Sequence, residues 1–370
     1  MTQNVHLLLG ALCSRYSARV RSYLLKKRIE YVERVPTAWT FQVTIKRRFG
    51  DPAIPVLITP EGEWIADSTL MLDHLETHYP QDPILPADPV HALFTTLADI
   101  WASEFWQPVD LYTRWSRPDH YPWWREELGE GLMAGFPKSV KNAFADKVAG
   151  TIQAHLPRLG ATPATWPLIR SWAERHMDAL DAHLAAQPYL LGERATPFDF
   201  GLIVPCFGHI ARDRHSRDEL MMPRPHLHEW VWRMNRPYLT PEAPPLPPPG
   251  SPLPATLQPV IRSLFDEMLP SIEATLAQLR RITPTVSPGA RVPRFLGTIS
   301  FPFGSGTLQR EGQAFTLWLT QRALDLVARM PATDAQLARA WLADNGGARL
   351  LELDIPRLEV SGLTVKFAAA

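Results

Sequence analysis

One short segment constrains the fold of this chain more than any other. It places an apolar-Pro pair, Ile54-Pro55, before a short strand, a tight turn and a returning strand, and then an acidic-Ser pair, Asp67-Ser68, at a helix start. A proline at the head of a strand gives up one ladder donor, so it belongs at an edge, a bulge or a cis turn. Helix-initial Asp and Ser keep polar groups beside free backbone N–H groups. The segment predicts a polar niche for the backbone and charged end of an extended peptide.

The composition excludes several classes of function. A chain of 370 residues with 45% hydrophobic content has room for two or three domains. Its zero net charge argues against an electrostatic nucleic-acid binder. Cys13 and Cys206 form neither a disulfide framework nor a metal-ligand spacing, and no histidine lies in register with a Cys or carboxylate cluster, so we expect a cytoplasmic protein without a metal.

Targeting and membrane signals are weak. The short apolar run before Cys13 has no Lys or Arg ahead of it, so no signal peptide is expected. No stretch approaches the ~20 apolar residues of a membrane span, so no membrane partner is expected either.

The first 80 residues alternate between strand and helix patterns. Strands are expected at 5–12 and 29–35 and in the Pro55 segment, and helices at 14–27, 40–49 and 68–79. The order β-α-β-α-β-β-α predicts a compact α/β domain at residues 1–80, followed by a proline-containing connector at 81–89.

The rest of the chain divides by composition. Residues 90–239 have helical patterns, with helices expected near 90–117, 138–156, 166–187, 197–213 and 224–236. Residues 240–254 are so rich in proline that they predict an extended linker. Residues 255–370 are mostly helical, with a strand or loop at 295–308 and a terminal strand at 359–367. We expect this extension to pack on the helical domain, because one helix pair and a strand make a thin independent core.

Five motifs in the same order resemble the cytosolic glutathione S-transferase superfamily over roughly residues 4–240. They are Ile54-Pro55, Asp67-Ser68, the Tyr-Leu-Leu-Gly-x-Arg-x-Thr-x-x-Asp run of 189–199, Pro225-His226-Leu227-His228-Glu229-Trp230, and the Arg233–Pro237 segment. The resemblance implies a thioredoxin-like α/β domain followed by an all-helical domain. The extension has no counterpart in the family pattern.

The resemblance also implies a glutathione site. In the family the proline is cis, and the residue before it, here Ile54, pairs its backbone with the cysteinyl unit of glutathione. The acidic-Ser pair, here Asp67 and Ser68, holds the γ-glutamyl group at a helix N-terminus, although Asp67 could be only a helix cap. Arg15 departs from the family pattern, and it either contacts the glycine carboxylate or faces solvent.

The family's catalytic position matches Ser14, with Cys13, Tyr16 and Ser17 as its neighbours and rivals. Lowering a thiol pKa by two units takes roughly 2.7 kcal/mol. One charge-assisted hydrogen bond supplies about 1.5–3 kcal/mol and a helix N-terminus about 0.3–1 kcal/mol, so one serine hydroxyl is sufficient. Ser14 could equally be only the N-cap of its helix. If the Cys13 sulfur faces the glutathione thiol, mixed-disulfide chemistry is expected instead.

Three functions stay open. The resemblance favours a glutathione transferase that joins the thiolate to a small hydrophobic electrophile, in a pocket to which Trp101, Phe105 and Trp106 are assigned unless they are core residues. A non-catalytic scaffold is the first alternative, because the extension could cover the cleft. A Cys13-dependent glutathione thiol reductase is the second. The family also implies a homodimer, which the extension could block.

Overall fold

The computed structural model describes residues 5–283 and 287–369, and its N-terminal part is built on a four-stranded sheet of order β2-β1-β3-β4. β1 (His6–Leu9) pairs parallel with β2 (Tyr31–Arg34) and antiparallel with β3 (Val56–Ile58), which pairs antiparallel with β4 (Trp64–Ala66). Leu8 opposes Leu57 in this register and both are fully buried. The sheet confirms the predicted thioredoxin-like domain.

The helices of this domain lie where the sequence predicts them. They are α1 (Arg15–Lys26), the π-helical turn η1 (Thr40–Ile45), α2 (Lys46–Phe49) and α3 (Ser68–His78). α1 packs against α3 on one side and against the helical part of the chain, through α9, on the other. This position brings the start of α1 and the start of α3 toward the boundary between the sheet and the helices.

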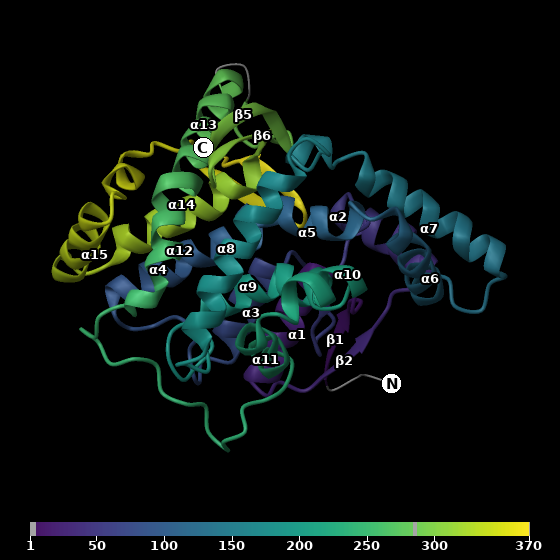
Figure 1. Ribbon diagram of the computed structural model, residues 1–370, viewed down its shortest axis with the longest axis horizontal. Helices are drawn as coiled ribbons and strands as arrows, with labels where there is room; N and C mark the ends of the chain where they lie inside the picture. Colours follow the sequence, from purple (N-terminus) through teal and green to yellow (C-terminus); the bar gives the residue numbers. More distant parts are fainter. Residues whose placement is uncertain (1–4, 284–286, 370) are drawn as a thin grey trace.

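The following region is helical, as expected, with its helices more broken than the sequence indicates. Its elements are α4 (Pro89–Ile100), η2 (Trp101–Phe105), α5 (Gln107–Trp115), η3 (Pro118–His120), α6 (Tyr121–Leu132), α7 (Lys138–Gln153), η4 (Pro157–Leu159), α8 (Trp166–Leu184), α9 (Pro197–Pro205), η5 (Cys206–Ile210), α10 (Arg214–Ser216), η6 (Arg217–Met221) and α11 (Pro225–Met234). The helix expected at 90–117 is two helices joined by the π-helical η2. α6 falls where no helix was predicted, and it projects with α7 as an arm that has a small core of its own (Figure 1).

Asp199 connects two of the sequence motifs. Its Oδ2 accepts the Thr196 N–H at 2.9 Å in a capping box at the start of α9. Its Oδ1 accepts the Leu190 N–H at 3.0 Å and the Trp230 indole N–H at 2.9 Å. One buried carboxylate therefore satisfies three donors and ties the 189–199 run to α11.

The extension adds both helices and two hairpins. Its elements are η7 (Ala255–Leu257), α12 (Gln258–Ser263), η8 (Leu264–Met268), α13 (Leu269–Ile282), β5 (Phe295–Phe303), β6 (Gly306–Gln313), α14 (Ala314–Arg329), α15 (Ala332–Asp344), η10 (Ala348–Glu352), β7 (Leu358–Ser361) and β8 (Thr364–Phe367). β5 pairs antiparallel with β6, and β7 with β8, so the expected terminal strand is a hairpin. The proline-rich linker before it forms no helix or strand and is held to the surface, where Asp88 accepts the Gly250 N–H at 2.8 Å.

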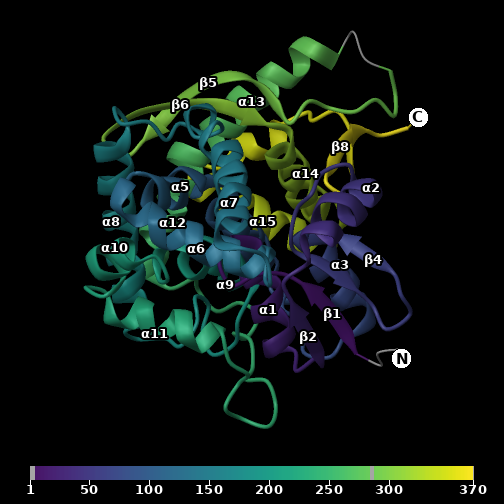
Figure 2. The ribbon, with the colours of Figure 1, turned by 90° about the vertical axis from the view of Figure 1, so that its right-hand side faces the viewer.

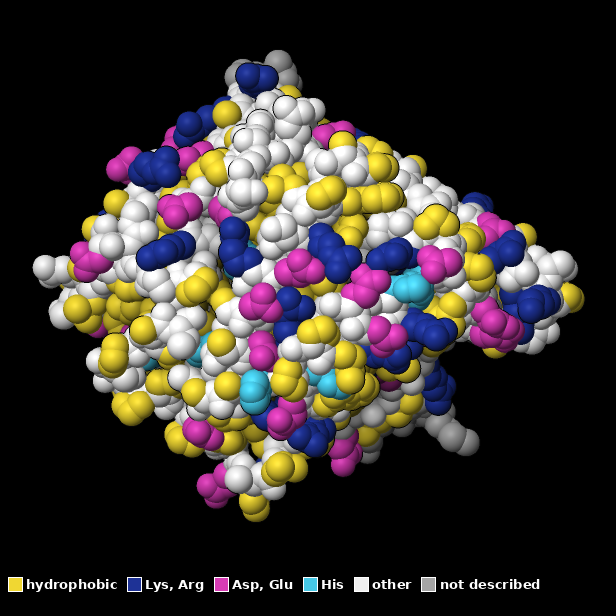
Figure 3. Space-filling view, in the orientation of Figure 1, with side chains coloured by type: hydrophobic (Ala, Val, Ile, Leu, Met, Phe, Trp, Pro, Cys, Tyr) yellow, Lys and Arg dark blue, Asp and Glu magenta, His cyan; other side chains and the backbone are white. Residues whose placement is uncertain are grey.

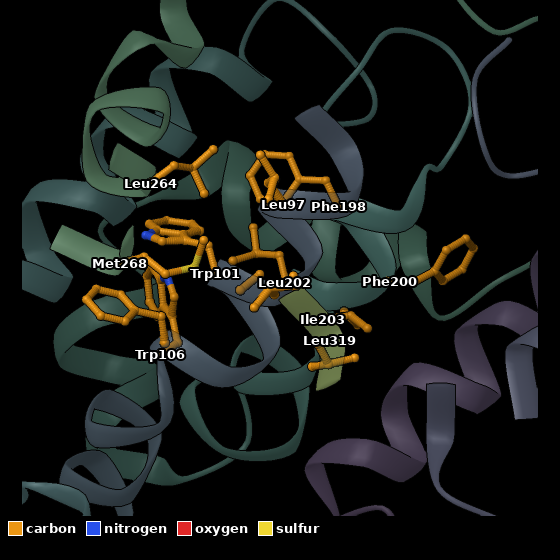
Figure 4. Close-up of a cluster of buried hydrophobic side chains, with 14 of the residues drawn as sticks. Leu97, Trp101, Trp106, Phe198, Phe200, Leu202, Ile203, Leu264, Met268 and Leu319 are labelled. Carbon is orange, nitrogen blue, oxygen red and sulfur yellow. The ribbon is translucent and has the colours of Figure 1, made fainter. Parts of the chain in front are cut away.

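The extension and the helical region share one hydrophobic core. Leu264 and Met268 of η8 lie beside Trp101 in this core, with Phe198 of α9 close by (Figure 4). Trp101 also donates its indole N–H to Ser263 Oγ at 2.8 Å. The contact is therefore both apolar and polar.

The surface carries no dominant charge on the face that Figure 3 shows, where cationic and anionic side chains are interspersed. This agrees with the balance of 38 basic and 38 acidic residues. Within residues 5–283 and 287–369, no helix has the length and apolar character needed to cross a membrane.

Candidate functional site

A pocket of about 230 Å³ lies where the N-terminal domain meets the extension. Its floor contains Ile54, Pro55, Asp67 and Ser68. Both motifs of the opening segment thus line one cavity. Its other walls come from the helical region and from the extension.

The floor has the backbone geometry that the resemblance implies. The Ile54–Pro55 peptide bond is cis, as expected. Asp67 has φ +73°, a left-handed value that is uncommon for a residue with a side chain. Such conformations cost about 1–3 kcal/mol and concentrate at ligand sites. Asp67 therefore combines the N-cap of α3 with an uncommon backbone conformation at the pocket floor.

Asp67 both caps α3 and lines the pocket. Oδ1 accepts the Thr69 N–H at 2.9 Å and the Leu70 N–H at 3.2 Å, which caps α3. Burial raises the pKa of Asp67 above its usual range, and these two hydrogen bonds act against the rise. Oδ2 and the hydroxyl of Ser68 remain as polar groups at the start of α3.

A series of hydrogen bonds between side chains forms a second wall of the pocket. Tyr16 donates its hydroxyl to Glu104 Oε1 at 2.7 Å, Gln107 donates to Glu104 Oε2 at 2.6 Å, and Gln313 donates to Gln107 Oε1 at 2.8 Å. All four residues line the pocket. We call them the polar wall. It joins α1, the helical region and β6 of the extension in one network.

Burial governs the chemistry of the polar wall. It raises the pKa of Glu104, although Arg15 nearby acts to lower it, and it raises the pKa of the Tyr16 hydroxyl well above its usual range. Tyr16 is therefore a neutral hydroxyl beside a carboxylate that is a better proton acceptor than an exposed one.

Ser14 lies outside the lining of this pocket. It is the N-cap of α1, and its Oγ accepts the Ser17 N–H at 3.3 Å. Cys13 does not line the pocket either, and burial raises the pKa of its thiol. Of the four neighbouring candidates that the sequence offered, Tyr16 is the one in the pocket lining.

Arg15 takes neither of the two roles expected of it. Its Nη1 lies 2.9 Å from Asp110 Oδ2, and its Nη2 donates to the Ser103 carbonyl at 2.7 Å. It does not line the pocket. The structure therefore places Arg15 in a largely buried ion pair behind the polar wall, because Asp110 is completely buried there and needs a cation.

Trp101, Phe105 and Trp106 lie in the core, not in the pocket. Their exposed fractions are 0%, 1% and 0%. The Phe105 ring centroid is 5.6 Å from those of both Phe301 and Phe303, which β5 of the extension supplies. The expected electrophile pocket is therefore filled by side chains from a segment that the family pattern lacks.

Residues of the extension form the side of the pocket that faces the floor. Val292 donates its N–H to the Val365 carbonyl at 2.9 Å, and Phe367 donates its N–H to the Ala290 carbonyl at 3.0 Å, so residues 289–294 and β8 form one layer. We call this layer, together with the start of α14, the roof. Its residues at the pocket are Arg291, Val292, Arg294, Phe315, Leu363, Thr364 and Val365.

The roof is attached to the N-terminal domain. Leu363 packs against the apolar cluster that contains Leu9 and Val56. Arg291 Nη2 lies 3.7 Å from Asp51 Oδ2. Figure 2 shows β8 beside α2 at this junction. No local sequence pattern identifies the roof, because its segments lie far apart in the chain.

Within the described parts of the chain, no group of three or more His, Cys, Asp or Glu side chains is arranged to hold a metal ion.

Comparison with known proteins gives one family match. Residues 8–83 match the model of the glutathione S-transferase N-terminal domain. No curated protein matches the chain.

The solved structures that match this chain are distant from it in sequence. A glutathione S-transferase from Rhodospirillum rubrum F11 is 16% identical, with a TM-score of 0.38 over 65% of this chain and 96% of that one. A glutathione S-transferase from Methylobacterium radiotolerans, in complex with glutathione sulfonate, is 17% identical, with a TM-score of 0.39 over 67% and 99%. FzlA from C. crescentus is 15% identical, with a TM-score of 0.40 over 62% and 87%. By the match of residues 8–83, the chain carries the N-terminal domain of the glutathione S-transferase superfamily, followed by a mostly helical remainder.

Proposed function

We propose that this protein binds glutathione in the pocket beneath the roof. The observation that carries the proposal is that the cis Ile54–Pro55 bond and the Asp67-Ser68 helix start line the same cavity. The Ile54 backbone pairs with the cysteinyl unit. Ser68 and the N-terminus of α3 bind the γ-glutamyl carboxylate, and Asp67 Oδ2 binds its ammonium group.

The reaction we propose is conjugation of glutathione to a small hydrophobic electrophile. Tyr16 is the hydroxyl available to the thiol, and its proton points to Glu104. In this scheme the thiol gives its proton to the Tyr16 oxygen as Tyr16 passes its own proton to Glu104. A thiolate, a neutral tyrosine and a neutral carboxylic acid result. Thiolate attack then forms the carbon–sulfur bond and expels the leaving group of the electrophile.

A non-catalytic glutathione-binding scaffold is the second candidate. Two observations favour it: Ser14 is committed to the α1 cap, and the aromatic residues assigned to the electrophile fill the core. The thiol reductase is less well supported, because burial raises the pKa of Cys13 and a thiolate is the nucleophile in that chemistry.

We also propose a cytoplasmic location and a division into domains at 1–80, 90–239 and 255–370, with a connector at 81–89 and a linker at 240–254. A homodimer remains part of the proposal with one condition. α14 and α15 cover one side of α4, so a dimer would have to form through a surface other than that side of α4.

The first test is calorimetric titration with glutathione. Wild type should bind, and Ser68→Ala should weaken binding by about tenfold, the value of one lost hydrogen bond to a charged group. Ser305→Ala, at an exposed position in the β5–β6 turn, is the matched control and should bind as wild type does. No binding by wild type would refute the proposal.

The second test separates the transferase from the scaffold. Turnover of an activated aryl halide should fall by about 10²-fold or more in Tyr16→Phe, the usual contribution of a positioned proton-transfer group, while glutathione still binds. Ser14→Ala should retain most of its activity. A loss confined to Ser14→Ala would return the role to Ser14, and binding without turnover in wild type would favour the scaffold.

A further inference from the structure

The charges around the pocket are unevenly distributed between the two parts that form it. Its acidic lining residues, Asp51, Asp67 and Glu104, all precede the extension. The cationic side chains of the described lining are Arg291 and Arg294, and both belong to the roof. Any second anionic group of a ligand in this pocket can therefore find a cation only on the extension.

Glutathione brings two carboxylates and one ammonium group. The γ-glutamyl end, with its carboxylate and ammonium, is accounted for by Ser68, Asp67 and the start of α3. The glycyl carboxylate has no cation on the floor or the polar wall, because Arg15 is held by Asp110 and the Ser103 carbonyl. Its partner must come from elsewhere.

The two roof arginines are available for this role. Arg294 is exposed, and its guanidinium has no hydrogen bond or ion pair with any residue in 5–283 or 287–369. Arg291 faces Asp51 across 3.7 Å in a pair that is 63% and 59% exposed. Exposed pairs of this kind contribute about 0–1 kcal/mol, so Arg291 can exchange Asp51 for a ligand carboxylate at little cost.

The polypeptide holds both arginines at the pocket edge. Residues 289–294 are bonded to β8 through the Val292 and Phe367 N–H groups, and Leu363 fixes β8 to the N-terminal domain. The backbone of this segment is therefore positioned before a ligand arrives, and only the two side chains need to order on binding.

We propose that the extension completes the glutathione site, with Arg294 and Arg291 binding the glycyl carboxylate and so selecting the full tripeptide over γ-glutamylcysteine. This inference rests on the proposed function. It adds a requirement that the N-terminal domain alone does not meet: the selectivity for the C-terminal carboxylate lies in residues 289–294.

The test is a cycle of two ligands and two proteins, measured by calorimetric titration on the full chain. The ligands are glutathione and γ-glutamylcysteine, and the proteins are wild type and Arg294→Ala. Wild type should bind glutathione about three- to tenfold more tightly than γ-glutamylcysteine. Arg294→Ala should lose most of this preference while its affinity for γ-glutamylcysteine stays unchanged. Arg291→Ala should act in the same direction, and Arg294→Lys should recover part of the preference because it keeps the charge.

Each outcome decides one of the two proposals. Arg339→Ala, which removes an exposed arginine on α15 away from the pocket, is the matched control and should behave as wild type. If wild type, Arg291→Ala and Arg294→Ala all had the same preference for glutathione over γ-glutamylcysteine, the inference would be overturned. The proposal of glutathione binding would stay intact. An equal weakening of both ligands would also overturn it, because the arginines would then act on the fold. Failure of wild type to bind either ligand would refute the proposed function itself.

Discussion

Replacing Arg310 by methionine is expected to stabilise this protein. Arg310 lies on β6 with 5% exposure, and its guanidinium is 5.4 Å from the Phe105 ring centroid and 5.3 Å from that of Phe301. Its Nη2 donates to Ser271 Oγ at 3.4 Å, whereas Nε and Nη1 have no hydrogen-bond partner in the described residues. A buried cation with so few partners is costly.

The magnitude follows from the proton equilibrium. Burial lowers the pKa of Arg310 from 12.5 to about 10. The lower pKa in the folded state corresponds to about 3 kcal/mol of destabilisation at neutral pH. The two ring contacts offset roughly 1–2 kcal/mol of it. Methionine keeps the apolar stem, so the net gain should be about 1–2 kcal/mol.

The assay is urea unfolding at neutral pH. Arg339→Met is the control, because Arg339 is exposed, and it should change the free energy of unfolding by less than about 0.5 kcal/mol. The folded state binds the Arg310 proton more weakly than the unfolded state, so wild-type stability should rise relative to Arg310→Met between about pH 10 and 12.5. If Arg310→Met were destabilised by about 1 kcal/mol or more, the reasoning would be refuted, since the cation would then be well satisfied.

Two further substitutions test buried contacts between helices. Asp213→Asn should cost about 3–5 kcal/mol, because Arg114 donates to both carboxylate oxygens at 2.7 Å. Burial opposes ionisation of Asp213, but Arg114 outweighs it and lowers the pKa, so this stabilisation should be present above about pH 4 and be lost as the pH falls below it, as unfolding midpoints in an acid series would reveal. Gly201→Ala on α9 should cost about 1–3 kcal/mol in urea unfolding, because its Cβ would lie 2.5 Å from Asp99 Oδ1 and 2.8 Å from Asp99 Cα on α4. Gly150→Ala on α7, with nothing within 4 Å, is the control and should stabilise by about 0.5–1 kcal/mol.

The parts of the fold that were predicted correctly are those with a local signal. Turn residues and proline mark the β3–β4 hairpin, and the Asp67-Ser68 pair marks the start of α3, so both appear where the sequence puts them. The same local signals bring Ile54 and Ser68 into one pocket, because a short hairpin leaves little freedom between them.

The parts that were missed depend on long-range contacts. α6 has two glycines, Gly129 and Gly131, and an exposed tryptophan at 123, which obscure its apolar face. The core around Phe105 is completed by β5, nearly two hundred residues later, and no periodicity relates the two segments. The proposal of Tyr16 in place of Ser14 likewise depends on where the helical region places Glu104.

The proposed boundary at residue 254 has a direct consequence for truncation. A chain that ends after Pro254 should fail to fold, because the extension supplies buried partners that the helical region cannot replace. The Trp101 indole N–H would lose Ser263 Oγ, and the Trp172 indole N–H would lose Glu267 Oε2, to which it donates at 2.7 Å. The truncation would also uncover apolar surface on α4 and α8, at about 25 cal/mol for each Å² exposed to water.

Co-expression of the two fragments tests whether the extension stabilises residues 1–254 through non-covalent contacts. Residues 1–254 alone should be recovered as aggregate, and co-expression with residues 255–370 should restore a soluble complex, since the lost contacts do not require a covalent link. A soluble 1–254 fragment that unfolds cooperatively and binds glutathione with wild-type affinity would contradict both this prediction and the role given to the roof. A soluble fragment that binds γ-glutamylcysteine and glutathione equally would contradict only the first. The truncation therefore tests whether the extension is needed for the core, for the ligand, or for both.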